Sequence, residues 1–150
     1  MAVVPLTGHV APVTGLVAEL VARGHDVRVY TGAGHLARFA ELGARVVPWT
    51  AAQDFDEEDL AGSFPRAGRS RTQRMLTLVR DGFIGTAPGQ VSDLRTAITQ
   101  EPADVLLADS RTNCGPLGHR ESPRARAASN SVRATCSAFS VAAAPTGFAS

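Results

Sequence analysis

The chain has 150 residues, of which 44% are hydrophobic, and this size and composition are typical of one globular domain. Its fifteen basic residues are all arginine and stand against fourteen acidic ones, for a formal net charge of +1. This balance argues against a nucleic-acid partner, and the absence of lysine excludes a Walker A loop or a Schiff base. Cys114 and Cys136 have no partner at metal-ligand spacing, so we expect no metal. We also expect a cytoplasmic protein, since no apolar run could span a bilayer and no signal peptide is evident.

The first fifty residues alternate between strand and helix patterns. Residues 2–6, AVVPL, have the length of a strand, and Pro12 is placed to open a helix that ends before Gly24. The apolar positions of that helix recur at helical spacing, at Val13, Leu16, Val17, Leu20 and Val21. A strand within residues 25–32, a helix over 33–44 and a strand over 45–49 follow. This order predicts a Rossmann-like α/β fold, in which a parallel sheet is flanked by helices.

Residues 50–70 interrupt the alternation and are expected to form a surface loop or lid. Their acidic run, Asp54 to Asp59, fits a solvated loop face better than a metal site. Helices are predicted from Thr72 to about Ile84 and from Pro88 through Ile98, followed by a buried strand at 104–108. In a sheet ordered 3-2-1-4 this last strand lies beside the first, so residues just past both carboxyl ends can meet.

Beyond residue 110 the pattern is lost. Residues 111–150 hold five arginines against one acid and show neither strand nor helix periodicity. We therefore divide the chain into a partial domain over 1–110 and a tail over 111–150. The tail is either disordered or the product of translation out of frame.

His9 follows the first predicted strand and precedes the first predicted helix. Ligands bind at this edge of an open α/β sheet, and an imidazole can act as a base near neutral pH. A helix cap or a packing residue is the alternative for His9, and a cap is the alternative for Asp109. A second motif, Gly32-Ala33-Gly34-His35-Leu36-Ala37, matches a dinucleotide fingerprint but follows the second strand rather than the first. An NAD-binding module is therefore an alternative function.

Three segments together resemble the family 1 glycosyltransferases of the GT-B fold, of the bacterial natural-product type. They are Gly8-His9-Val10-Ala11-Pro12, then Arg23-Gly24-His25-Asp26-Val27 with Thr31-Gly32, and finally PADVLLAD at residues 102–109. The resemblance covers roughly residues 2–110. It implies the incomplete amino-terminal, acceptor-binding half of an inverting enzyme that transfers a sugar from a nucleotide-sugar to a hydroxyl of a small hydrophobic acceptor.

The resemblance also implies roles for individual residues. His9 would be the general base, and Asp109 would accept a hydrogen bond from its other ring nitrogen. Phe64 and Met75 are candidates for the acceptor wall, whereas Leu76 and Phe83 are expected in the core. The donor, a UDP- or dTDP-sugar bound without a metal, would lie against a second domain whose H-x-G-G-x-G-type segment is absent from these 150 residues. A non-catalytic pseudogene fragment is the further alternative.

Overall fold

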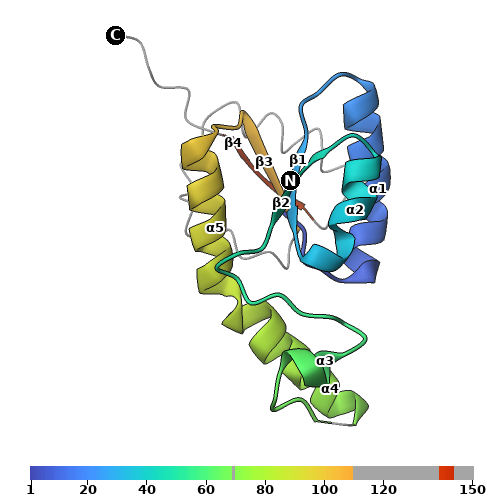
Figure 1. The fold of residues 1–150 in the computed structure, drawn as a ribbon, viewed down its shortest axis with the longest axis vertical. Helices are drawn as coiled ribbons and strands as arrows, with labels where there is room; N and C mark the ends of the chain where they lie inside the picture. The colour runs from blue at the N-terminus through green and yellow to red at the C-terminus, as the bar shows by residue number, and fades with distance from the viewer. Residues whose placement is uncertain (69, 110–138, 144–150) are drawn as a thin grey trace.

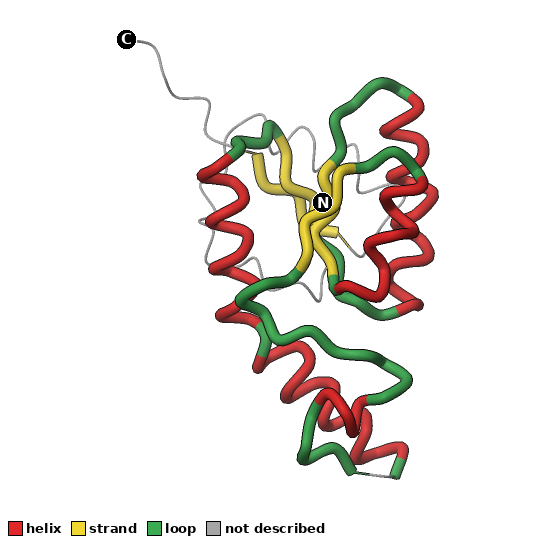
Figure 2. Tube along the Cα trace, viewed as in Figure 1, coloured by secondary structure: helices red, strands yellow, loops and turns green. Residues whose placement is uncertain are grey.

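The computed structural model describes residues 1–68, 70–109 and 139–143, and these form a three-layer α/β arrangement. In Figure 1 the strands lie centrally, with α1 (Thr7–Ala22) and α2 (Leu36–Glu41) on one side and α5 (Ala87–Gln100) on the other. A short helix, η1 (Ala33–His35), leads directly into α2. The helices α3 (Leu60–Ser63) and α4 (Arg71–Thr77) extend away from the sheet with the loop that precedes them, as Figure 2 shows.

Two pairs of strands meet at the amino-terminal segment. Strand β1 (Arg28–Thr31) runs parallel to β2 (Arg45–Pro48), and β3 (Val105–Asp109) runs antiparallel to β4 (Phe139–Ala143). Ala2 forms parallel bridges to Tyr30 and to Ala108, so residue 2 lies between β1 and β3. The prediction that the strand ending at 108 lies beside the first segment is therefore confirmed.

The beginning of the chain differs from the prediction at residues 2–6. These residues form no strand beyond the two bridges of Ala2, because the backbone turns soon afterwards, with the Leu6 N–H donating to the Val4 carbonyl at 2.8 Å. Helix α1 then begins at Thr7 rather than at Pro12, which lies inside the helix. A proline there removes one intrahelical hydrogen bond. The other end agrees with the prediction, since Gly24 has a φ of 82°.

Strand β4 lies within the segment where no regular element was predicted. Its five residues pair with β3 from Val105 opposite Ala143 to Asp109 opposite Phe139. Pairing with an existing strand edge can order a segment that has no pattern of its own. The prediction of a disordered or out-of-frame tail otherwise falls on 111–138 and 144–150, which lie outside the described residues.

Two hydrophobic clusters cover the two faces of the sheet, as alternation along a strand requires. The cluster beneath α1 and α2 contains Val3, Val10, Val13, Val17, Val27, Val29, Phe39 and Ala44. The cluster on the opposite face contains Ala2, Val4, Leu6, Tyr30, Trp49, Ala52, Phe55, Leu60, Phe64, Phe83, Leu94 and Ala108. Val29 and Tyr30, neighbours in β1, thus face opposite layers. Leu16, predicted on the apolar face of α1, is instead 37% exposed.

Helices α4 and α5 are joined by a helical segment of unusual type. Residues Leu78–Gly85 form a π-helix, η2, between α4 and α5, where an ordinary helix was predicted as far as Ile84. Pro88 stands in the first turn of α5, as predicted. In a π-helix each backbone hydrogen bond spans five residues instead of the four of an α-helix. This changes which side chains of the segment face the core.

Gly89 allows α5 to pack directly on the backbone that follows β2. A Cβ at this position would lie 2.4 Å from both the Ala51 carbonyl oxygen and the Ala52 Cα. We expect Gly89→Ala to destabilise the fold by about 2 kcal/mol or more, since backbone atoms cannot move aside cheaply. Gly15→Ala is the matched control. Gly15 is also helical but has nothing within 4 Å of such a Cβ, so this change should stabilise by roughly 0.5–1 kcal/mol. Urea unfolding measures the free energy of unfolding of both variants. Changes of the same sign would contradict the close packing of α5 on the backbone after β2.

Candidate active site

The structure brings His9 and Asp109 together, although one hundred residues separate them. The His9 Nδ1 atom lies 2.6 Å from the Asp109 Oδ2 atom. The carboxylate is buried, with a side-chain exposure of 2%, whereas the imidazole keeps 31%. A carboxylate at Nδ1 favours the tautomer that carries its proton there, and Nε2 is then the nitrogen available to accept a proton. The pair is therefore arranged as a base and the group that orients it.

Local backbone contacts place both side chains. His9 belongs to the first turn of α1, where its N–H donates to the Leu6 carbonyl at 2.9 Å. Asp109 is the last residue of β3, and its N–H donates to the Ala2 carbonyl at 2.9 Å. Leu6 and Ala2 belong to the same short segment, so one stretch of backbone fixes the helix start and the strand end. The imidazole thus reaches the carboxyl edge of the sheet.

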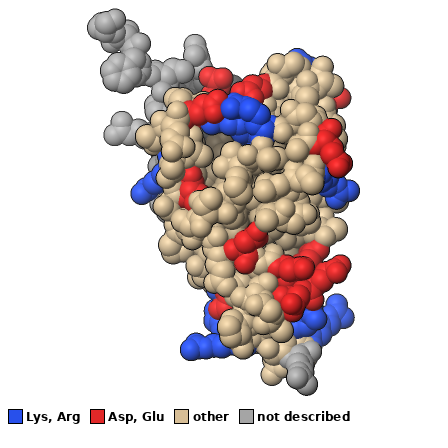
Figure 3. Space-filling view, in the orientation of Figure 1, with Lys and Arg blue, Asp and Glu red and all other residues tan. Residues whose placement is uncertain are grey.

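Acidic residues of the loop before α3 contact this same edge. The Asp54 carboxylate accepts a hydrogen bond from the Ala33 N–H at 2.6 Å, and both oxygens of Glu57 lie 3.1 Å from the Thr7 nitrogen. Asp59 caps α3 by accepting from the Gly62 N–H. Figure 3 shows acidic side chains gathered on the lower part of the molecule, next to arginines at its tip. Asp56, Glu58 and Asp59 are exposed, in line with the expected solvated loop face, whereas Asp54 and Glu57 are half-buried and accept hydrogen bonds from backbone N–H groups.

Asp93, which the sequence reasoning did not single out, is a buried carboxylate with several donors around it. It accepts from the Tyr30 hydroxyl at 2.9 Å and from the Thr50 hydroxyl. The backbone N–H groups of Thr50, Ala51 and Ala52 also donate to it, at 2.8 to 3.2 Å. Burial raises its pKa, but the hydrogen bonds from Thr50, Ala51 and Ala52 together outweigh burial and lower the pKa to about 2. Asp93 thereby holds α5 to the segment that follows β2.

The two residues predicted for the acceptor wall, Phe64 and Met75, differ in their exposure to solvent. Phe64 is 4% exposed and packs against Phe55, with ring centroids 5.5 Å apart, so its ring offers little surface to an acceptor in this conformation. Met75 is 60% exposed on α4. Leu76, expected in the core, is 63% exposed, whereas Phe83 is buried as expected. One side of α4 therefore presents apolar side chains to solvent.

The glycine motif at residues 32–37 has a local packing role in this structure. A Cβ on Gly32 would lie 2.3 Å from Asp54 Oδ1 and 2.7 Å from Pro5 Cβ. The Ala33 N–H, which would face a phosphate in a dinucleotide fingerprint, already donates to Asp54. These contacts do not favour the dinucleotide alternative.

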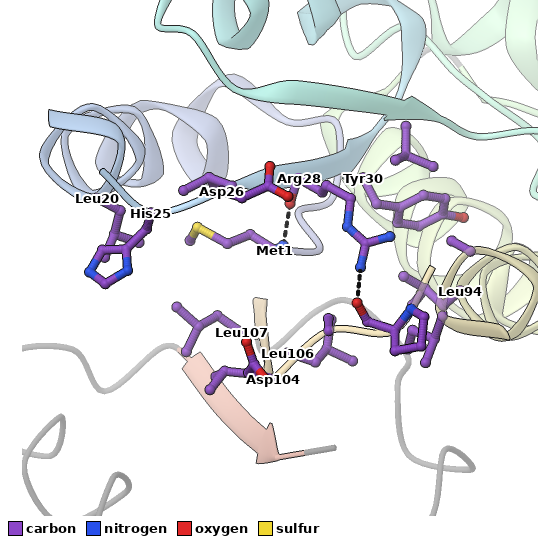
Figure 4. Close-up of a pocket in the computed structure, with 17 residues that line it drawn as sticks. Met1, Leu20, His25, Asp26, Arg28, Tyr30, Leu94, Asp104, Leu106 and Leu107 are labelled. Atoms are coloured by element: carbon purple, nitrogen blue, oxygen red, sulfur yellow. Dashed lines mark hydrogen bonds between the residues drawn. The ribbon is translucent and has the colours of Figure 1, made fainter. Parts of the chain in front are cut away.

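A cavity of about 440 Å³ lies at the other end of the sheet. Figure 4 shows it between the amino-terminal ends of β1 and β3, with Arg28 reaching across to the Pro102 carbonyl. It is thus remote from His9 and Asp109 along the strands. Within the described residues, no group of three or more His, Cys, Asp or Glu side chains could hold a metal ion. No helix among those residues is both long and apolar enough to cross a bilayer.

The described residues thus form a Rossmann-like α/β domain with a histidine–carboxylate pair at the carboxyl edge of its sheet. No family model matches the chain. Among curated proteins, 4'-demethylrebeccamycin synthase of Lentzea aerocolonigenes is 38% identical over 110 residues, which are 73% of this chain and 26% of that protein. UDP-glucosyltransferase B1 of Starmerella bombicola is 31% identical over 105 residues, which are 67% of this chain and 24% of that protein.

The structural comparison agrees on the fold. The crystal structure of CalG4, the calicheamicin glycosyltransferase, superposes with a TM-score of 0.50 at 24% identity, over 67% of this chain and 23% of that one. The chain is thus a homologue of glycosyltransferases with the GT-B fold. It spans about a quarter of the length of the curated relatives that it matches.

Proposed function

We propose that this chain is the acceptor-side part of an inverting glycosyltransferase and that His9 is its general base. The contact between His9 Nδ1 and Asp109 Oδ2 carries the proposal. In the reaction, Nε2 of His9 takes the proton of an acceptor hydroxyl while that oxygen bonds to the anomeric carbon of the sugar. The bond from that carbon to the nucleoside diphosphate breaks, and the diphosphate leaves with the electron pair. A single displacement of this kind inverts the anomeric configuration.

Asp109 supports the proton transfer from behind the imidazole. Its carboxylate is buried and aligned with Nδ1, so it stabilises the imidazolium that forms and holds the ring in one orientation. An acceptor with a hydrophobic surface suits the exposed apolar side of α4, which carries Met75. The nucleotide-sugar, UDP- or dTDP-linked, is proposed to bind mainly to a second domain.

A chimaera tests this function directly. Residues 1–109 of this chain would replace the matching segment of 4'-demethylrebeccamycin synthase. We expect the folded chimaera to transfer sugar from a nucleotide-sugar to hydrophobic hydroxyl acceptors, with the anomeric configuration of the product inverted. The parent enzyme serves as the positive control. Absence of transfer by a folded chimaera, while the parent is active under the same conditions, would contradict the proposal.

The 150 residues by themselves are expected not to turn over a nucleotide-sugar. The leaving diphosphate needs positively polarised donors, commonly glycine-rich backbone N–H groups at a helix start. The sequence has no H-x-G-G-x-G-type segment, and the first N–H group of α1 donates to Glu57 rather than facing a ligand. Mass spectrometry of reactions with UDP-glucose and dTDP-glucose checks this expectation, with the chimaera as control. Product formed by the isolated chain would refute it.

A further inference from the structure

Glu57 lies at the amino end of the helix that carries His9. Both of its carboxylate oxygens are 3.1 Å from the nitrogen of Thr7, the first residue of α1. The residue before it, Leu6, has no side-chain group that could cap the helix. A negative charge here satisfies an N–H group that has no acceptor within the helix and interacts favourably with the helix dipole. Glu57 therefore caps α1 from a loop fifty residues away.

The loop holds Glu57 in place through contacts that do not involve α1. Asp54, three residues earlier, accepts from the Ala33 N–H at 2.6 Å. The Arg74 guanidinium of α4 donates to the Glu57 carbonyl at 3.3 Å. The side chain of Glu57 is half-buried, whereas that of the next residue, Glu58, is exposed. The Glu57 carboxylate is thus presented to α1 by a loop that is attached to its surroundings on both sides.

We propose that Glu57 is a positioning residue, which holds the first turn of α1 so that the His9 imidazole stays against Asp109. His9 is two residues beyond Thr7, in the same turn, and its N–H donates to the Leu6 carbonyl. Asp109 is fixed independently by β3 and by the Ala2 carbonyl. The distance between imidazole and carboxylate therefore depends on where the first turn of α1 lies. This inference rests on the proposed function and adds a residue to its site.

The experiment follows the Nδ1–H proton of His9 by NMR in the complete 150-residue chain. In the unchanged protein this proton should be observable and protected by its hydrogen bond to Asp109. Removal of a helix cap costs about 1 kcal/mol, so we expect Glu57→Ala to speed exchange of this proton with water about five- to tenfold. Glu57→Gln keeps one acceptor oxygen, so its exchange rate should lie between those of the unchanged protein and Glu57→Ala. Glu58→Ala is the matched control and should leave exchange unchanged.

The outcomes are distinguishable from a general loss of stability. The unchanged protein, brought by urea to the stability of Glu57→Ala, serves as the control, so exchange in Glu57→Ala must exceed exchange in this sample. If Glu57→Ala does not fold, Glu57→Gln decides, and exchange equal to that of the unchanged protein would overturn the proposal. Failure to observe a protected Nδ1–H in the unchanged protein would also overturn it. If exchange responds as expected but the chimaera with His9→Ala retains full turnover, Glu57 still positions the ring while the base assignment fails.

Discussion

Replacement of His9 by alanine in the chimaera is expected to lower turnover by about 10² to 10⁴ and to change acceptor affinity little. A general base acts on the proton in the transition state, so its loss reduces kcat more than it affects binding of the ground state. The fold should tolerate the change, because the imidazole is partly exposed and packs in neither hydrophobic cluster. Steady-state kinetics and urea unfolding together check both parts of this expectation.

Asp109, the hydrogen-bond partner of His9, provides a second variant for the same test. Asp109→Asn keeps the shape of the side chain but removes the charge that supports the imidazolium, so turnover should fall in the same direction. The double variant should lose less than the product of the two single losses, because the residues act as a unit. If His9→Ala instead unfolded the protein while the remaining folded enzyme kept full turnover, the imidazole would be a packing or capping residue.

Asp93→Asn is expected to destabilise the chain by roughly 2–4 kcal/mol. The aspartate is 7% exposed and accepts hydrogen bonds from Tyr30, Thr50, Ala51 and Ala52. An asparagine places an NH₂ group against these donors and leaves some of them buried without an acceptor. Asp104→Asn is the control, since that residue is exposed, and it should change stability by less than about 0.5 kcal/mol. Equal urea midpoints for the two variants would contradict a structural role for Asp93.

The pH dependence of stability follows from the same carboxylate. Its pKa in the folded protein is lowered from the ordinary value of 3.8 to about 2. The group therefore stabilises the fold fully above pH 4, and this contribution is lost as the pH falls from about 4 to about 2. The loss should amount to about 1–2 kcal/mol. Urea unfolding across this interval should show a steeper decline for the unchanged protein than for Asp93→Asn.

The residues considered for the acceptor wall differ in their exposure to solvent. Met75 and Leu76 are neighbours in the sequence and both are exposed, whereas Phe64 lies inside the hydrophobic cluster that also contains Tyr30 and Leu94. In the proposed function, α4 therefore offers an apolar surface to an acceptor in this conformation, whereas the ring of Phe64 does not. Residue type did not predict which of these apolar side chains would be buried. Burial depends on which side of the segment faces the sheet.

Local sequence determined the strands β1, β2 and β3 and most of the helical segments. Valine-rich runs, Gly24 and Gly43 after helices, and Pro88 at the start of α5 act over a few residues, and the structure follows them. The adjacency of residue 2 and Ala108 also followed from the sequence, because parallel α/β units have few allowed orders. This adjacency was enough to predict that His9 and Asp109 could meet.

Tertiary structure decided the features that depend on distant partners. Helix α1 starts at Thr7, whose N–H donates to Glu57 of a distant loop, and no pattern near Pro12 reveals that contact. The carboxylate of Asp93 is satisfied by backbone N–H groups some forty residues away, which carry no sequence signal at all. Strand β4 is defined by pairing with β3 rather than by its own alternation. Local periodicity reports how a segment can fold, whereas caps, buried charges and edge strands depend on which groups the finished fold brings within hydrogen-bond distance.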